Sequence, residues 1–229
     1  RKPPELRKFP RCIAAIYRLG TPNILMQAAY TVYIFGLNLI LATFSDQAVT
    51  VLGLYYKWQS FFFIPLGSMQ TCIVPVVSYN YAARNIGRCK KTLVTAIVFG
   101  MALMFLGTLC FEIIPGPMLR VFSSDEKVIE IGVTAFRIIG ISFIPLVSSL
   151  TFPVFFQAVG WSLKSSLLTV FRTVVLFVPL AFIFSRIGGL DWFWLTFPVT
   201  DSLSTLLGFI WYKKFMRRPY AVSYTHLRA

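Results

Sequence analysis

The chain has 229 residues, of which 57% are hydrophobic and 13% charged, and its formal net charge is +14. Its mean hydropathy is +0.72. Soluble domains carry about 25% charged residues, and a fold of this length cannot keep so much apolar surface from water. The composition therefore excludes an ordinary soluble protein and predicts an integral membrane protein.

The chain opens with a basic segment, residues 1–18, which we predict to be a cytoplasmic linker. The part from Phe9 to Leu19 is amphipathic and is expected to lie along the inner membrane surface. A solvated linker is the alternative. The sequence lacks an initiating Met and shows no signal peptide, so we expect a fragment whose N-terminal part is missing.

Six apolar segments follow, each near the roughly 20 residues that an α-helix needs to cross a bilayer. Strands are excluded, because open strands in lipid leave backbone groups without hydrogen bonds. The predicted fold class is all-α: a polytopic membrane protein with a six-helix transmembrane lobe over residues 19–214. The predicted spans are residues 19–43, 51–78, 92–114, 130–156, 165–187 and 190–212.

Residues 215–229 are expected to form a cytoplasmic tail. Its last part, Ala221 to Ala229 (AVSYTHLRA), resembles a peptide read through from a sequencing adapter, and we exclude it from functional reasoning. An ordinary disordered tail is the alternative.

Basic and acidic connections alternate along the chain. Lys and Arg gather in residues 84–91, at Lys164 and in residues 213–218, whereas the other connections hold mostly acids such as Asp46 and Asp125. This positive-inside pattern places both ends in the cytoplasm. We expect the protein in the plasma (inner) membrane. A nucleic-acid partner is not expected, because its binding face would need basic residues gathered on one folded surface.

Residues suited to metal or enzyme chemistry are scarce. The four cysteines have no CxxC spacing, and the one histidine, His226, lies close to the C-terminus. A membrane-embedded enzyme would need a carboxylate or histidine cluster near the interface. We therefore predict no catalytic residue, no metal site and no cofactor.

Uncharged polar side chains form two stripes at helical spacing. Amides beside aromatic rings suit a cavity for bulky, often cationic organic molecules, since rings stack on the ligand and attract cations. Alternatively, the amides only hydrogen-bond between packed helices. Span one contributes Gln27, Tyr30, Thr31, Ile34 and Asn38; span two contributes Tyr56, Gln59, Ser60, Phe63, Gly67 and Gln70.

Several charged residues fall inside the spans, where each costs about 2.5–3.5 kcal/mol at mid-bilayer. Lys57 and Arg137 are predicted to shape the electrostatics of the cavity, with snorkelling to the interface as the alternative. Snorkelling is the favoured interpretation for Arg172. Asp201 either pairs with a basic residue such as Arg172, which we favour, or carries a proton for coupling.

Several motifs occur in a fixed order. They are KWQSFFFIPLG (residues 57–67), YNYAAR (79–84), VFSSDEKVIEIG (121–132), FFQAVG (155–160) and GLDWFWLTFPVTD (189–201). Together they resemble the C-terminal lobe of the multidrug and toxic compound extrusion (MATE) transporters, from about Leu19 to Lys214. The resemblance implies one half of a twelve-helix antiporter that exports organic molecules by alternating access, driven by H⁺ or Na⁺.

The resemblance also has departures. Ala82 replaces the usual glycine of the YNYGAR loop, which could alter the turn there. The carboxylates that some members carry in the first and fourth helices of this lobe are absent, so the coupling-ion site is expected in the missing N-terminal lobe. The predicted partners are small-molecule substrates, the lipid bilayer and that lobe.

The predicted function is cation-coupled export of organic, often cationic drugs. One alternative is a related flippase for lipid-linked sugars, which would use basic residues in its cavity; another is a non-transporting structural membrane subunit. The predicted substrate-binding residues are Gln27, Tyr30, Asn38, Lys57, Phe63, Gln70 and Arg137.

Overall fold

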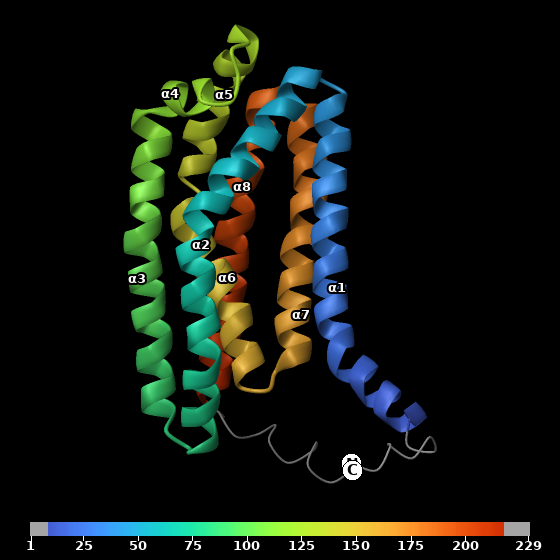
Figure 1. Cartoon of the computed structure of the whole chain (residues 1–229), viewed down its shortest axis with the longest axis vertical. Coiled ribbons are helices and arrows are strands. Elements are labelled where there is room, and N and C mark those ends of the chain that lie inside the picture. The colour runs from blue at the N-terminus through green and yellow to red at the C-terminus, as the bar shows by residue number, and fades with distance from the viewer. Residues whose placement is uncertain (1–8, 218–229) are drawn as a thin grey trace, which may run out of the picture.

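The computed structural model describes residues 9–217, so residues 1–8 of the predicted linker and residues 218–229 of the predicted tail lie outside the described residues. Every secondary-structure element of the described chain is helical. Figure 1 shows an elongated bundle in which long helices run alternately up and down. The all-α fold class is therefore confirmed.

The first three helices are long and follow one another through short turns: α1 (Phe9–Ala42), α2 (Asp46–Ala82) and α3 (Ile86–Ile113). The first turns of α1 bend away from the bundle (Figure 1). Ser45 accepts a hydrogen bond from the Ala48 N–H at the start of α2, and Asn85 does the same for Arg88 at the start of α3. Such side-chain caps satisfy N–H groups that have no partner within the helix.

The α2–α3 turn does not depend on a glycine at position 82. Ala82 is the last residue of α2, and the residue with a left-handed backbone is Arg84, with φ 57°. Ala82, which stands where the resemblance implies a glycine, therefore occupies an ordinary helical position, and the expected disturbance of this turn does not arise.

The middle of the chain forms a short helix and a bent pair: α4 (Pro115–Arg120), α5 (Glu126–Gly140) and α6 (Phe143–Ala158). The axes of α5 and α6 differ by 55°. Pro145 lies in the first turn of α6, where its missing N–H breaks no helical hydrogen bond. Its carbonyl accepts a hydrogen bond from the Thr205 hydroxyl at 2.7 Å, which ties the bend to the last helix.

The last third consists of α7 (Ser162–Val170), a π-helical segment η2 (Phe171–Phe177) and α8 (Val178–Arg217). Helix α8 reverses direction at Gly189, whose φ of 69° and ψ of −149° belong to a region that is essentially restricted to glycine. Arg172 and Asp201 are in contact although 29 residues separate them, which requires this reversal.

Three described helices are long and apolar enough to cross a membrane: Asp46–Ala82, Ile86–Ile113 and the continuous stretch Ser162–Arg217, which the reversal at Gly189 folds in two. The bent pair α5–α6 passes the same test when taken together. The apolar part of α1, Gln27–Ala42, is shorter. Large apolar side chains such as Ile64 and Phe99 are exposed on the outside of the bundle, as expected of a surface in contact with lipid.

Several glycines lie at close contacts between helices. A Cβ on Gly100 of α3 would lie 2.7 Å from Val147 of α6, and one on Gly208 of α8 would lie 2.6 Å from Phe152 of α6. Small residues at such contacts are how membrane helices gain van der Waals packing. Helix α6 is thus held tightly between α3 and α8, which fixes the wall it gives to the cavity described next.

Candidate functional site

A cavity of about 540 Å³ lies between α1, α2, α6 and the α7–η2 segment. Of the hollows in the described part of the chain, this one combines four helical elements with a lining rich in polar groups. No Asp or Glu of the described residues belongs to the lining. Its polar residues are Gln27, Tyr30, Tyr33, Gln59, Ser60, Gln70, Ser149, Gln157, Ser165, Thr169, Arg172 and Thr173.

Four of the predicted substrate-binding residues line this cavity: Gln27 and Tyr30 from α1, and Phe63 and Gln70 from α2. Gln70 follows Phe63 by seven positions, which is nearly two helical turns, so both side chains point the same way. The Gln70 Nε2 donor is buried and has no hydrogen-bond partner among the described residues. A ligand oxygen in the cavity would give it one.

Asn38, by contrast, does not line the cavity. Its Nδ2 donates a hydrogen bond of 2.8 Å to the Ile34 carbonyl, within its own helix. The cavity lining on α1 ends at Tyr33, and Asn38 lies about 7 Å farther along the axis. The polar stripe of span one therefore extends beyond the length of helix that faces the cavity.

Lys57 also lies outside the cavity, which corrects its predicted role. It is six residues before Phe63, about 120° around α2, and its side chain is exposed. The Lys57 Nζ instead lies 4.8 Å from the centre of the Phe122 ring, in the connection before α5. This contact is a cation–π interaction at the end of the bundle.

Arg137 is the third predicted substrate-binding residue that does not line the cavity. It is exposed in the last turn of α5, whereas the cavity is lined by α6 from Leu146 onward. The bend between the two helices separates them. Sequence reasoning treated residues 130–156 as one span and therefore expected Arg137 on the same helix as the residues that line the cavity.

Arg172 lines the cavity, contrary to the prediction that it snorkels to the interface. Its Nε donates a hydrogen bond of 2.7 Å to Asp201 Oδ1, and the two side chains form a salt bridge. The predicted pairing of Asp201 with Arg172 is therefore confirmed. The Ser149 hydroxyl also donates to Asp201 Oδ1, at 3.3 Å.

The pair is buried: the Asp201 side chain is 2% exposed and that of Arg172 is 14% exposed. The charges of Arg172 and Asp201 are opposite and in contact, so their electrostatic fields largely cancel a few ångströms away. The pair therefore adds little net charge to the cavity. The guanidinium keeps further N–H donors that Asp201 does not occupy. The cavity thus presents hydrogen-bond donors, amide and hydroxyl groups and aromatic rings, with no free carboxylate in the described lining.

The π-helical segment positions Arg172 next to the cavity. It spans Phe171–Phe177 and is followed by Pro179, which has no N–H to donate to a preceding carbonyl. A π-helical turn is wider than an α-helical one and occurs often at functional sites. Sequence analysis did not predict this feature, although Pro179 and a charged residue inside the predicted span, Arg172, were visible in the sequence.

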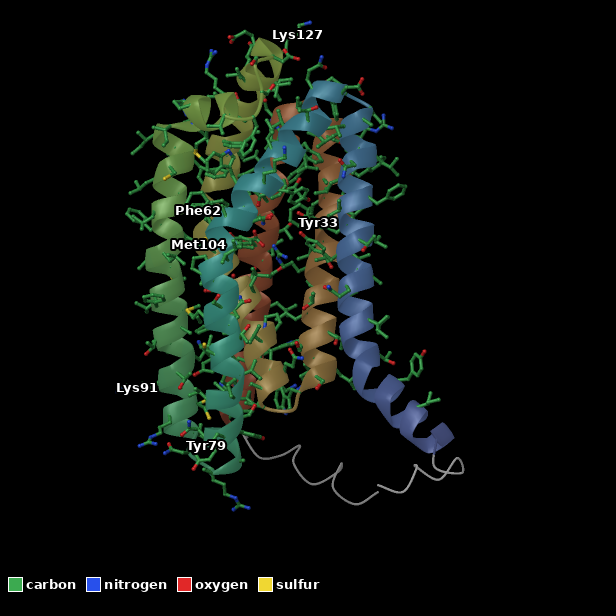
Figure 2. All side chains as sticks on the ribbon, in the orientation of Figure 1. Tyr33, Phe62, Tyr79, Lys91, Met104 and Lys127 are labelled. Atoms are coloured by element: carbon green, nitrogen blue, oxygen red, sulfur yellow. The ribbon has the colours of Figure 1, made fainter. Side chains whose placement is uncertain are left out.

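Tyr33 is the main aromatic residue of the cavity that sequence analysis did not select. It is 6% exposed and its ring packs edge-on against Phe177, with ring centres 4.7 Å apart. In Figure 2 it points from α1 toward the inside of the bundle. It follows Tyr30 by three residues, and the two ring centres lie 5.7 Å apart, so the spacing itself could have identified it.

The described residues contain no group of three or more His, Cys, Asp or Glu side chains that could hold a metal ion.

Comparison with known proteins gives concordant results. The family model described as MatE matches residues 22–183. The multidrug export protein MepA of Staphylococcus aureus is 22% identical over 195 residues, which cover 85% of this chain and 43% of the relative. MepA of Staphylococcus haemolyticus is 23% identical over 176 residues, covering 76% of this chain and 38% of the relative.

Solved structures share the fold at low sequence identity. A MOP superfamily transporter from Pyrococcus furiosus has a TM-score of 0.83 at 23% identity. The match covers 94% of this chain and 49% of the transporter's chain. An outward-facing multidrug resistance MATE transporter has a TM-score of 0.84 at 23% identity. This match covers 93% of this chain and 49% of the transporter's chain. The chain spans about half the length of the relatives it matches.

Proposed function

Since this chain belongs to the MatE family of transporters, we propose that it is the C-terminal lobe of a multidrug exporter, with its cavity as one wall of the substrate site. The observation that carries this proposal is the cavity of about 540 Å³ between α1, α2, α6 and α7–η2. Its size and mixed polar and aromatic lining suit an amphipathic organic molecule. The multidrug export proteins among its relatives support the same class of substrate.

The polarity of the cavity narrows the range of substrates that we propose for it. Amide and hydroxyl groups and the rings of Tyr30, Tyr33 and Phe63 offer hydrogen bonds and stacking surfaces. A cationic drug would meet aromatic faces here, but no free carboxylate in the described lining. We therefore expect the carboxylate that balances a cationic substrate to come from the other lobe, together with the H⁺ or Na⁺ coupling site.

Transport would follow alternating access between two lobes, with the lobe described here moving as one body. In support, the lobe has a TM-score of 0.84 with both an outward-facing and an inward-facing MATE transporter structure. Rocking of two structural repeats around a central site is a common mechanism in secondary transporters.

For the orientation, we propose the plasma membrane with both ends of this chain in the cytoplasm. The described residues at the end of the bundle that holds the α2–α3 and α6–α7 connections include Arg84, Lys91, Lys164 and Lys213 and no Asp or Glu. This charge bias is that of cytoplasmic connections. Membrane-impermeant labelling of single cysteines placed at Arg84 and at Glu130 would test it, with labelling from outside expected only at position 130.

The flippase alternative has less support than the sequence indicated. It rested on Lys57 and Arg137 as basic residues of the cavity, and neither lines it. Arg172 does, but Asp201 balances its charge. A polyanionic pyrophosphate would therefore find no unpaired cation on the described wall.

The test is export of a fluorescent dye by the complete transporter carrying Gln70→Ala. Loss of the amide should reduce export several-fold at unchanged expression, because a good neutral hydrogen bond contributes about 1 kcal/mol. Gln47→Ala is the matched control, since Gln47 lies on the same helix but outside the cavity lining. Equal export by both variants would contradict the assignment of the cavity.

A further inference from the structure

A second hollow, of about 590 Å³, runs along the outside of the bundle between α2 and α3. We call it the α2–α3 groove; its lining extends from Arg88 to Phe99 on α3 and from Met69 to Asn80 on α2. The body of the groove is apolar, and its lining includes Val76 and Phe99, whose side chains are 45% and 61% exposed. Apolar groups open to the outside of a membrane bundle face lipid.

Two cations stand at one end of the groove. Arg88 and Lys91 are both exposed and both belong to the lining. Among the residues that the structure describes, no carboxylate forms an ion pair with either of them. Figure 2 shows Lys91 near the end of α3 that lies opposite to Lys127, close to Tyr79 at the end of α2. The groove is therefore amphipathic, with its positive charge confined to one end.

The length of the groove corresponds to the depth of one membrane leaflet. Eleven residues separate Arg88 from Phe99, which on an α-helix is about 16 Å. The hydrocarbon core of a bilayer is about 30 Å thick, so one leaflet is roughly 15 Å deep. Cations at the level of the headgroups and an apolar channel reaching the midplane match the shape of one phospholipid.

The groove is separate from the substrate cavity. Both use α2, but Phe63 faces the cavity and Val76 faces the groove. Thirteen residues at 100° per residue place Val76 about 140° around the helix from Phe63. No residue lines both hollows, so occupation of the groove leaves the substrate cavity open.

We propose that the α2–α3 groove binds one anionic phospholipid from the leaflet adjoining this end of the bundle. Its phosphate pairs with Arg88 and Lys91, and one acyl chain lies along Val76 and Phe99. Basic pockets between transmembrane helices on the cytoplasmic side suit acidic headgroups. The proposal goes beyond the transport function, because it concerns the lipid-facing side of the lobe and would hold whatever substrate the cavity takes.

Charge complementarity sets the expected size of the effect. Each Lys or Arg near an anionic membrane surface contributes about a fivefold gain in affinity for acidic lipid, so two contribute roughly 30-fold. A zwitterionic headgroup has no net charge and should gain little from the same two cations.

The experiment measures phospholipid bound to the full-length protein by native mass spectrometry, with phosphatidylglycerol and phosphatidylcholine as probes. Arg88→Gln with Lys91→Gln should weaken phosphatidylglycerol binding roughly 30-fold and leave phosphatidylcholine unchanged. Lys213→Gln with Lys214→Gln is the matched control, because these exposed cations lie at the same end but outside the groove.

A second variant tests the apolar part independently. Val76→Trp fills the groove from an exposed position and should weaken phosphatidylglycerol binding while Arg88 and Lys91 are intact. An equal loss in the Lys213 and Lys214 control would overturn the proposal in favour of general surface attraction. Unchanged binding in either groove variant would overturn it too, as would competition by inorganic phosphate alone, which would indicate an anion site without an acyl chain.

Discussion

Replacing Asp201 by asparagine would leave the Arg172 guanidinium buried without its counter-charge. The two groups are 2.7 Å apart, and only 14% of the Arg172 side chain is exposed, so water can replace little of the lost interaction. Two unit charges about 4 Å apart interact by about 4 kcal/mol at an effective dielectric constant of 20. Removing one partner of a buried pair costs about 3–5 kcal/mol in measured cases.

The measurement is the thermal unfolding midpoint of the purified protein in detergent. For a unit of about 200 residues, each kcal/mol shifts the midpoint by about 2–4 °C, so Asp201→Asn should lower it by roughly 6–20 °C. Asp191→Asn on the same helix is the matched control, because Asp191 is exposed and forms no ion pair with another described residue. It should change the midpoint by no more than a few degrees.

The double variant Arg172→Met with Asp201→Leu distinguishes the contribution of the ion pair to stability from the contribution of side-chain packing. It removes both charges at similar volume, which in other buried pairs is neutral or stabilising. Its midpoint should therefore lie above the midpoints of the two matching single variants, Arg172→Met and Asp201→Leu, each of which leaves one charge without its partner. If the double variant loses as much as the two single variants added together, the two charges are not coupled and the reasoning is refuted.

Three further predictions concern packing, backbone and charge. Gly208→Ala should destabilise the protein by about 1–3 kcal/mol in thermal unfolding, because its Cβ would lie 2.6 Å from Phe152. Gly189→Ala should cost on the order of 1–3 kcal/mol in the same assay, since its φ of 69° and ψ of −149° suit glycine alone. Lys57→Gln should leave dye export within twofold of the parent protein, because Lys57 lies outside the cavity.

Each of these has an outcome that would count against it. Gly53→Ala is the control for the packing prediction, since nothing lies within 4 Å of its Cβ; destabilisation as large as that of Gly208→Ala would argue against the close contact. An unchanged midpoint for Gly189→Ala would mean that the reversal tolerates a side chain. A large loss of export in Lys57→Gln, at normal expression, would support a role for Lys57 in substrate binding.

Much of the lobe could be predicted from the sequence because its signals are local. Apolar segments near 20 residues long, separated by charged turns, identify membrane helices without any knowledge of their neighbours. Gln27, Tyr30, Phe63 and Gln70 were found because helical periodicity alone places polar residues of one stripe on one face. Asp201 was matched to Arg172 because a charge in lipid needs a partner.

Asn38, Lys57 and Arg137 show where periodicity stops being informative. A helical stripe gives an angle around one helix, but it does not say over what length the neighbouring helices leave a cavity open. The bend of 55° between α5 and α6 leaves Arg137 outside the cavity lining, whereas the π-helical segment Phe171–Phe177 holds Arg172, which belongs to the lining. The sequence by itself determined the all-α membrane fold class and the pairing of Asp201 with Arg172, because both follow from transfer out of water. Which polar groups share the cavity was decided only by tertiary structure, because it depends on how bent helices pack against one another.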